Sequence, residues 1–157
     1  MEEKDVKAVH ELLNDYLKKF KLHIQYTKKE IAHFLLPREN VIESFVVEDP
    51  VSKKITDFTS FYSLPSSVLK HDTHKMLHVA YSYYNVPNKY NLTALVKDAL
   101  IMAKNKGYDV FNALDVQQNL EFMKEHKFGV GDGNLHYYLY NWRIQKLTPQ
   151  DCGIVLV

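Results

Sequence analysis

The spacing of apolar residues changes repeatedly along this chain between a helical and a strand-like period, and this alternation most constrains the fold. Apolar side chains over residues 6–20 recur at helical spacing, which predicts an amphipathic helix with Asp5 as its N-cap. Thr27 and Glu30 have the spacing of a capping box, which predicts a second helix that ends at Pro37. The chain therefore opens with two helices.

Short segments rich in β-branched and aromatic residues follow. We predict strands at residues 41–47, 55–62, 76–86, 108–114, 135–143 and 153–157. Asn91 and Gly107 mark the start and end of a helix between two of these strands, and Asp115 opens a shorter helix. This order is typical of an α/β fold with mixed strand direction. The strand expected ahead of the first helix is absent, which suggests one piece of a larger protein.

Length and charge restrict the chain to few classes of protein. It has 157 residues, 46% hydrophobic and 25% charged, so residues 1–157 should form one domain with a substantial core. The net charge of +1 predicts no binding of nucleic acid, and no run reaches the ~18 apolar residues of a transmembrane helix. The N-terminus does not have the pattern of a secretory signal, and one cysteine does not suggest an oxidising compartment. We therefore expect a cytoplasmic protein.

Three alternating glycines lie between Lys127 and Asn134, in the segment KFGVGDGN. A phosphate-binding loop is one interpretation, but the spacing is not GxGxxG, no helix is predicted to begin at Asn134, and Asp132 would repel an anion. An exposed acid among backbone amides suits a cation or a polar peptide better. The other interpretation is a tight hairpin loop whose glycines have positive φ.

Aromatic residues are numerous, with eleven Tyr, eight Phe and one Trp. Tyrosine is apolar along its ring and polar at its tip, so it suits the wall of a groove, although a Tyr-rich β core would give the same count. In the predicted strand 135–143, alternation places Leu135, Tyr137 and Leu139 on one face. The opposite, aromatic face could stack single-stranded nucleic acid, but only Arg143 supplies a nearby cation, so packing within a sheet is the better explanation.

Side chains that often carry catalysis have little support here. His74 and His78 have the spacing of a helical metal pair, but with His71 they lack a nearby cysteine and precede a predicted strand, so we expect surface histidines and no metal. Cys152 follows an acidic residue, which would raise rather than lower the pKa of its thiol. Ser66 lacks the GxSxG elbow of a serine hydrolase.

The chain ends on the apolar residues Ile154-Val155-Leu156-Val157, whereas most domains end in polar, frayed residues. We expect this segment to be held in the fold as a strand. Its α-carboxylate then either emerges into water, which is the usual case, or is fixed at the floor of a cavity. Burial would raise its pKa above the ~3.3–3.7 of a free α-carboxyl group and make it a better proton acceptor, whereas a partner ammonium would lower the pKa.

Several of these segments together resemble one family. The segment KFGVGDGNLHYYLYNW and the chain end GIVLV closely resemble the C-terminal end of the eukaryotic N-myristoyltransferases, of which KFGxGDG is a signature. Further blocks match the second half of that family in the same order, namely VHELLNDYLKKFKL, DFTSFYSLPSS, HVAYSYYNV and GYDVFNALD. The resemblance covers nearly all of this chain and well under half of a full family member.

The resemblance implies a GNAT-like (acyl-CoA N-acyltransferase) α/β fold, in which a mixed sheet is flanked by helices and here lacks its first strand. In GNAT enzymes that bind CoA, a Q/R-x-x-G-x-G/A loop after the fourth strand holds the pyrophosphate at the start of a helix. The corresponding residues 84–91 contain no glycine. We therefore expect this half to bind no cofactor, and myristoyl-CoA to be the co-substrate of the full enzyme.

The resemblance also implies a function. Residues 1–157 would be the peptide-binding, C-terminal domain of an enzyme that transfers myristate from myristoyl-CoA to N-terminal glycine amines. Its partners would be glycyl peptides and proteins and the N-terminal half of the same enzyme, and the isolated chain should be inactive. The carboxylate of Val157 would act as the catalytic base. The implied substrate-binding residues are Ser66, Tyr81, Asn112, Asp132, Gly133, Leu135 and Leu156.

Two alternatives remain open beside this function. One is a non-catalytic peptide-binding or scaffold domain that keeps a GNAT-like shell. The other, a free-standing GNAT acetyltransferase, is disfavoured by the missing pyrophosphate loop.

Overall fold

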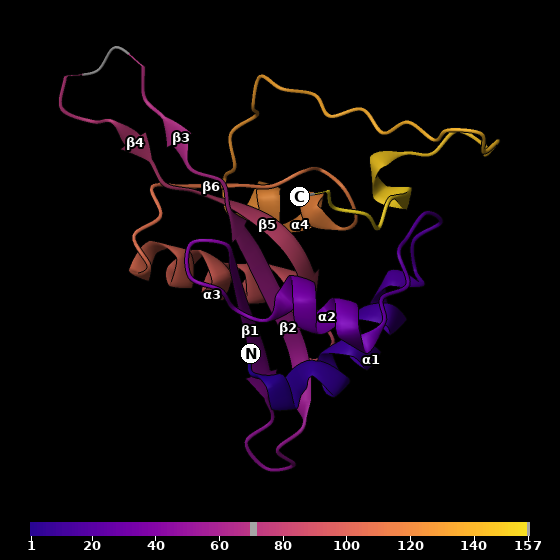
Figure 1. Cartoon of the computed structure of the whole chain (residues 1–157). Helices are drawn as coiled ribbons and strands as arrows, with labels where there is room; N and C mark the ends of the chain where they lie inside the picture. The colour runs from indigo at the N-terminus through magenta and orange to yellow at the C-terminus, as the bar shows by residue number, and fades with distance from the viewer. Residues whose placement is uncertain (70–71, 157) are drawn as a thin grey trace.

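The computed structural model describes residues 1–69 and 72–156 and is built around a sheet with the strand order β1-β2-β5-β6 (Figure 1). These strands are β1 (Ile42–Glu48), β2 (Ile55–Ser63), β5 (Val79–Val86) and β6 (Val110–Asn112). β2 pairs antiparallel with β1 on one side and with β5 on the other, and β6 runs parallel to β5. A separate ribbon of β3 (Ser66–Ser67) and β4 (Met76–Leu77) follows β2. The predicted α/β fold with mixed strand direction is confirmed.

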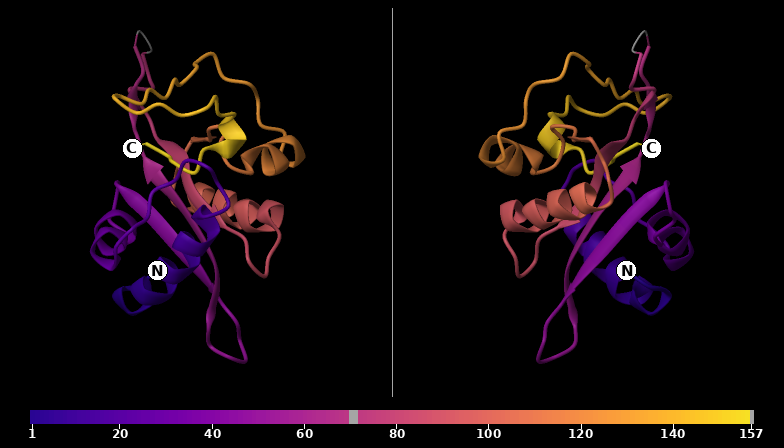
Figure 2. Two further views of the ribbon diagram at one scale, coloured as in Figure 1. Left: turned by 90° about the vertical axis from the view of Figure 1, so that its right-hand side faces the viewer. Right: turned by 90° about the vertical axis from the view of Figure 1, so that its left-hand side faces the viewer.

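Helices cover both faces of this sheet (Figure 2). They are α1 (Val6–Leu17), α2 (Lys28–Leu35), α3 (Leu92–Asn105) and α4 (Asn119–Glu125), with short 3-10 helices η1 (Glu3–Asp5) and η2 (Pro149–Asp151). One buried cluster joins α1 and α2 to the sheet through Leu13, Ile31 and Phe58. A second cluster packs Ala99 of α3 against Phe61 on the other side. No helix in the described part of the chain is long and apolar enough to cross a membrane.

Of the four predicted helix starts, those at Thr27 and Asn91 are confirmed. Thr27 and Glu30 form the capping box of α2, in which the Thr27 amide donates to Glu30 Oε2 at 2.7 Å. Asn91 caps α3 through its side-chain oxygen. Asp5 directly precedes α1 as predicted, but its side chain does not cap that helix, because its carboxylate accepts from the amide of Glu2 at 2.7 Å in the capping box of η1.

A β-bulge interrupts the pairing of β2 with β5. The register shifts between Thr59 and Phe61, so that Tyr83 and Tyr84 both lie opposite Ser60. The Ser60 hydroxyl donates to the carbonyl of Tyr84 at 3.2 Å, and the Tyr84 amide donates to the Ser60 hydroxyl oxygen at 3.1 Å. Successive residues of a regular strand point to opposite faces, whereas a bulge redirects them. Here both tyrosines are buried in the cluster that contains α1.

Two of the predicted strands are absent from the described residues. Residues 135–143 lie in the long loop after α4, and residues 153–156 are extended but belong to no sheet. A strand exists only where a neighbour pairs its backbone, and alternation of side chains cannot supply that neighbour. Two shorter predicted elements are present with different bounds. The strand predicted at 108–114 is limited to β6, and the helix predicted from Asp115 begins at Asn119.

A single bridge brings the end of the chain back to the segment after α1. The amide of Leu22 donates to the carbonyl of Asp151 at 3.1 Å, and the amide of Gly153 donates to the carbonyl of Leu22 at 2.7 Å. Cys152, between Asp151 and Gly153, forms an isolated parallel bridge with Leu22. At this crossing a Cβ on Gly153 would lie 3.0 Å from Phe20 Cδ2. Glycine is thus required here by close approach and not by backbone conformation.

Substitution of this glycine should destabilise the fold. We expect Gly153→Ala to lower the free energy of unfolding by about 1–3 kcal/mol, because the added methyl overpacks against Phe20 and His23. Urea unfolding followed by circular dichroism measures the change. Gly131→Ala is the matched control, since a Cβ there meets nothing within 4 Å. Equal urea midpoints for the two variants would contradict the close approach at Gly153.

Candidate functional site

The tail, defined as residues 152–156, is held by tyrosine hydroxyls in place of a strand ladder. The amide of Val155 donates to the Tyr84 hydroxyl at 3.4 Å, and the Tyr137 hydroxyl donates to the carbonyl of Ile154 at 3.0 Å. Val155 is buried, and its side chain belongs to the cluster that contains α1. The tail is therefore positioned by one tyrosine from β5 and one from the loop after α4.

The last described residue, Leu156, lies beside one end of the sheet, and two predicted site residues, Tyr81 and Asn112, lie on the strands at that end. The Tyr62 hydroxyl donates to the carbonyl of Leu156 at 3.4 Å, and the Tyr62 ring stacks on Tyr81 with centroids 5.4 Å apart. Tyr81 pairs with Asn112 across β5 and β6. Tyr62 thus contacts both Leu156 and Tyr81, and Asn112 is the neighbour of Tyr81 on β6. The side chain of Leu156 is 55% exposed.

The other predicted binding residues lie on two exposed segments. Ser66 is exposed and pairs with Leu77 in the ribbon that follows β2. Asp132, Gly133 and Leu135 are exposed in the loop after α4. No strand or helix of the described chain fixes this loop, and Ser66 belongs to the separate ribbon, so no contact joins these four residues to Tyr81.

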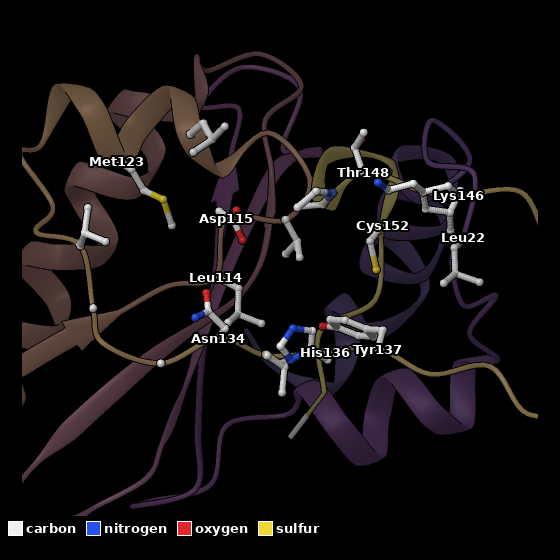
Figure 3. A pocket seen from close by; sticks show the side chains of 18 of the residues that line it. Leu22, Leu114, Asp115, Met123, Asn134, His136, Tyr137, Lys146, Thr148 and Cys152 are labelled. Carbon is white, nitrogen blue, oxygen red and sulfur yellow. The ribbon is translucent and has the colours of Figure 1, made fainter.

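The loop after α4 encloses a groove of about 960 Å³ next to the tail (Figure 3). Its walls are largely apolar and include Leu22, Leu114, Met123, Tyr137 and Cys152. The predicted residues Gly133 and Leu135 also line the groove, whereas Asp132 is not among its lining residues. Since Tyr137 and Cys152 belong to both, the groove and the tail form one continuous region.

Two predicted residues, Val157 and His71, lie outside the described residues. The role expected for the carboxylate of Val157 is therefore untested by this geometry. Within the described part of the chain, no group of three or more His, Cys, Asp or Glu residues is arranged to hold a metal ion.

Burial keeps the hydroxyls around the tail protonated. Burial raises the pKa of Tyr84 to about 12, an effect that the hydrogen bond with Tyr26 partly opposes. Burial, followed by the nearby Cys152, also raises the pKa of Tyr137 to about 12. Both groups are therefore neutral hydrogen-bonding side chains at neutral pH, and neither is suited to act as a base.

Cys152 is not suited to act as a nucleophile. Burial raises the pKa of its thiol, which points to the carbonyl of Ile154 at 3.7 Å. The pKa of the thiol is raised, as the sequence suggested, but the cause is burial and not the neighbouring Asp151. The carboxylate of Asp151 turns away to Lys21, at 3.0 Å, and to the amide of Thr148, also at 3.0 Å.

Sequence reasoning missed the tyrosines that position the tail. The count of tyrosines suggested a lined groove, but it could not identify Tyr62, Tyr84 and Tyr137. Tyr62 lies opposite Tyr81 in the register of β2 and β5, and Tyr84 faces the tail because of the bulge at Ser60. A register and a bulge depend on which strands pair, and periodicity alone does not contain that information.

Comparisons with known proteins identify the family. Residues 1–155 match the family model described as "Myristoyl-CoA:protein N-myristoyltransferase, C-terminal domain". The chain is 53% identical over 156 residues to glycylpeptide N-tetradecanoyltransferase 2 of Bos taurus, covering 99% of this chain and 31% of the relative. It is 50% identical to glycylpeptide N-tetradecanoyltransferase 1 of Arabidopsis thaliana, covering 100% of this chain and 36% of the relative. The chain spans about a third of the length of these curated relatives.

Solved structures support both the family and the fold. The N-myristoyltransferase of Saccharomyces cerevisiae, solved with bound myristoyl-CoA, superposes with a TM-score of 0.79 at 38% identity, over 85% of this chain and 35% of the yeast protein. An acetyltransferase of Trypanosoma brucei superposes with a TM-score of 0.63 at 19% identity, over 88% of this chain and 96% of that protein. The second likeness concerns the fold alone and confirms the predicted GNAT-like architecture. From the family match over residues 1–155, the chain belongs to the N-myristoyltransferase family and corresponds to its C-terminal domain.

Proposed function

We propose that this chain is the peptide-binding and catalytic-base part of an N-myristoyltransferase. The full reaction would transfer myristate from myristoyl-CoA to the N-terminal glycine amine of a peptide or protein. The observation that carries the proposal is the contact of Tyr62 with the carbonyl of Leu156 beside Tyr81 and Asn112. In the proposed site, the carboxylate of Val157, the next residue in the sequence, would act beside these polar side chains.

The chemistry requires a base at that edge. A peptide α-amine has a pKa of about 7.7–8.0, so at neutral pH most of it is ammonium, which has no free electron pair. In the proposed step, the terminal carboxylate of Val157 accepts a proton from the ammonium while the nitrogen bonds to the thioester carbon. The carbon–sulfur bond then breaks, and the second proton of the nitrogen passes to the departing sulfur, so that CoA leaves as the thiol and the product is a neutral amide. A free carboxyl group is about four pKa units more acidic than the amine, so a partly dry site or concerted transfer must assist.

The remaining predicted residues would hold the peptide. Tyr81 and Asn112, neighbours on β5 and β6, would offer a hydroxyl and an amide to the reacting nitrogen, and Ser66, exposed on the ribbon of β3 and β4, would contact the peptide from a separate segment. Asp132, Gly133 and Leu135 would contact the peptide beyond its glycine, along the loop that borders the groove. Glycine at the first position is favoured in this scheme because a side chain there would clash in a narrow site.

The rest of the enzyme would supply the acyl donor. The curated relatives are about three times longer than this chain, and the yeast structure is described with bound myristoyl-CoA. The loop after α4 exposes Tyr138 at 87%, Tyr140 at 92% and Trp142 at 63%, an aromatic surface that suits contact with the N-terminal half. Residues 1–157 would thus act as one domain of a larger enzyme, and the cytoplasmic location stays a prediction.

The isolated chain should not catalyse the reaction. We expect no turnover of myristoyl-CoA and a glycyl peptide by residues 1–157 alone, because the acyl-CoA site would belong to the N-terminal half. Release of the CoA thiol, followed with a thiol reagent, measures turnover. Turnover by the isolated chain at the rate of a complete enzyme would refute this division of roles.

Asn112 should contribute to peptide binding in a completed enzyme, in which this chain replaces the matching part of the Bos taurus relative. We expect Asn112→Ala to raise the KM for a glycyl peptide by about tenfold, the effect of one lost hydrogen bond of ~1–1.5 kcal/mol, with a smaller change in kcat. Tyr90→Phe is the control, since Tyr90 lies half-exposed beyond the opposite end of β5. An unchanged KM for Asn112→Ala would remove this residue from the peptide site.

Extension of the chain by one glycine after Val157 separates the enzyme from a non-catalytic binding domain. The extra residue moves the carboxylate, so kcat of the completed enzyme should fall by about 10²–10⁴-fold, the typical contribution of a positioned base. The melting temperature should stay the same, because the tail is held upstream at Val155 and Ile154. Full retention of kcat would exclude the terminal carboxylate as the base and favour the peptide-binding or scaffold alternative.

A further inference from the structure

One peptide unit of the tail is held at both of its polar atoms. The Tyr137 hydroxyl donates to the carbonyl oxygen of Ile154, and the amide of Val155 donates to the Tyr84 hydroxyl. These two backbone atoms belong to the same peptide unit, which is planar. Contacts at both atoms therefore fix the orientation of the whole unit. Only the backbone dihedrals of the last three residues then separate it from the chain end.

The hydroxyl of Tyr84 has a second partner in the core. Tyr26 Oη lies 3.1 Å from Tyr84 Oη, and the two rings meet edge to face with centroids 5.9 Å apart. Tyr84 is 0% and Tyr26 6% exposed, so this contact is removed from bulk water. Since Tyr84 Oη accepts from Val155, the Tyr26 oxygen is the one hydrogen-bond partner left for the Tyr84 proton among the described residues. A buried hydroxyl proton without an acceptor is costly, so Tyr26 determines the direction of the Tyr84 hydroxyl.

Tyr26 is itself held in place by the two helices at the start of the chain. The side-chain amide nitrogen of Asn14, in α1, donates to the carbonyl of Tyr26 at 2.9 Å. The amide of Tyr26 donates to Asn14 Oδ1, also at 2.9 Å. The Tyr26 ring packs edge-on against Phe34 of α2, with centroids 6.4 Å apart. The position of Tyr26 is therefore fixed from the side of the helices and without the tail.

We propose that Tyr26 is a positioning residue for the terminal carboxylate of Val157, on which it acts through Tyr84 and the tail. The inference rests on the proposed function, in which that carboxylate is the base. A base must lie within about 2.6–3.2 Å of the atom whose proton it accepts, and a small misplacement lowers the rate strongly. Because Tyr26 is buried in the cluster that contains α1, its hydroxyl should affect the position of the base and not the binding of the peptide.

The test uses the completed enzyme, in which this chain replaces the matching part of the Bos taurus relative. Tyr26→Phe keeps the ring and removes the hydroxyl. We expect kcat to fall by about three- to tenfold, the effect of one hydrogen bond, with an unchanged KM for a glycyl peptide. An unchanged kcat, or a rise of KM without a fall of kcat, would overturn the proposal.

Tyr16→Phe is the matched control. Tyr16 lies in the same buried cluster and is 4% exposed, but its hydroxyl donates to Gln118 Oε1 at 3.3 Å and not to the tail. The two variants should therefore have similar melting temperatures, whereas Tyr16→Phe should retain kcat. Amide exchange of the tail, followed by mass spectrometry, should be faster in Tyr26→Phe than in Tyr16→Phe. An equal fall of kcat in both variants, or equal exchange of the tail, would overturn the proposal.

A double-mutant cycle with the one-glycine extension after Val157 separates this inference from the proposed function. The extension already displaces the carboxylate, so Tyr26→Phe should change kcat of the extended enzyme by less than about twofold. A further three- to tenfold fall in the extended enzyme would mean that Tyr26 does not act through the carboxylate, and it would overturn the proposal. If the extension lowers kcat and Tyr26→Phe alone does not, only the role of Tyr26 is refuted. If the extension alone leaves kcat unchanged, the proposed base is refuted, and the role of Tyr26 toward it is refuted as well.

Discussion

The bulge opposite Ser60 is the constraint on which the arrangement of the tail depends. It turns two adjacent residues of β5, Tyr83 and Tyr84, into the same buried cluster. Tyr84 then meets the tail at Val155, while the ring of Tyr83 contacts Tyr62 with centroids 5.8 Å apart. In a strand without the bulge, one of the two tyrosines would face the side of α3, and the connection from the core to the sheet edge would be lost.

Side-chain hydroxyls hold the tail in a way that a strand would not. A ladder fixes every second residue of a strand on each side and continues to the chain end, whereas here single hydroxyls fix Ile154, Val155 and Leu156 one at a time. Burial keeps the pKa of Tyr84 and of Tyr137 near 12, so these contacts stay neutral. A neutral surrounding disfavours a charged carboxylate unless an ammonium accompanies it, which would suit the role proposed for the terminal carboxylate.

Local patterns in the sequence were sufficient for the helices and for the hairpin of β1 and β2, because caps and periodicity act within a few residues. The capping box at Thr27 and the cap at Asn91 are examples. The same patterns failed for residues 135–143, where the alternation of Leu135 and Tyr137 is strand-like but no neighbour is present in the described chain. Of the candidate site, Tyr81 and Asn112 are neighbours on β5 and β6. Tyr62 reaches Tyr81 only through the register of β2 and β5, which no local pattern in the sequence fixes.

The two ends of β2 and β5 therefore have opposite properties. At one end, Tyr62 and Tyr81 meet Leu156 and leave polar groups accessible beside Asn112. At the other end, Asp57 Oδ1 accepts hydrogen bonds from the amides of Asn88, Lys89 and Tyr90 in the turn that leads into α3. A fold likeness at 19% identity to an acetyltransferase carries no information on which end binds a ligand. The two ends differ in individual side chains of β2, since the Tyr62 hydroxyl reaches the tail at one end and the Asp57 carboxylate accepts from the turn before α3 at the other.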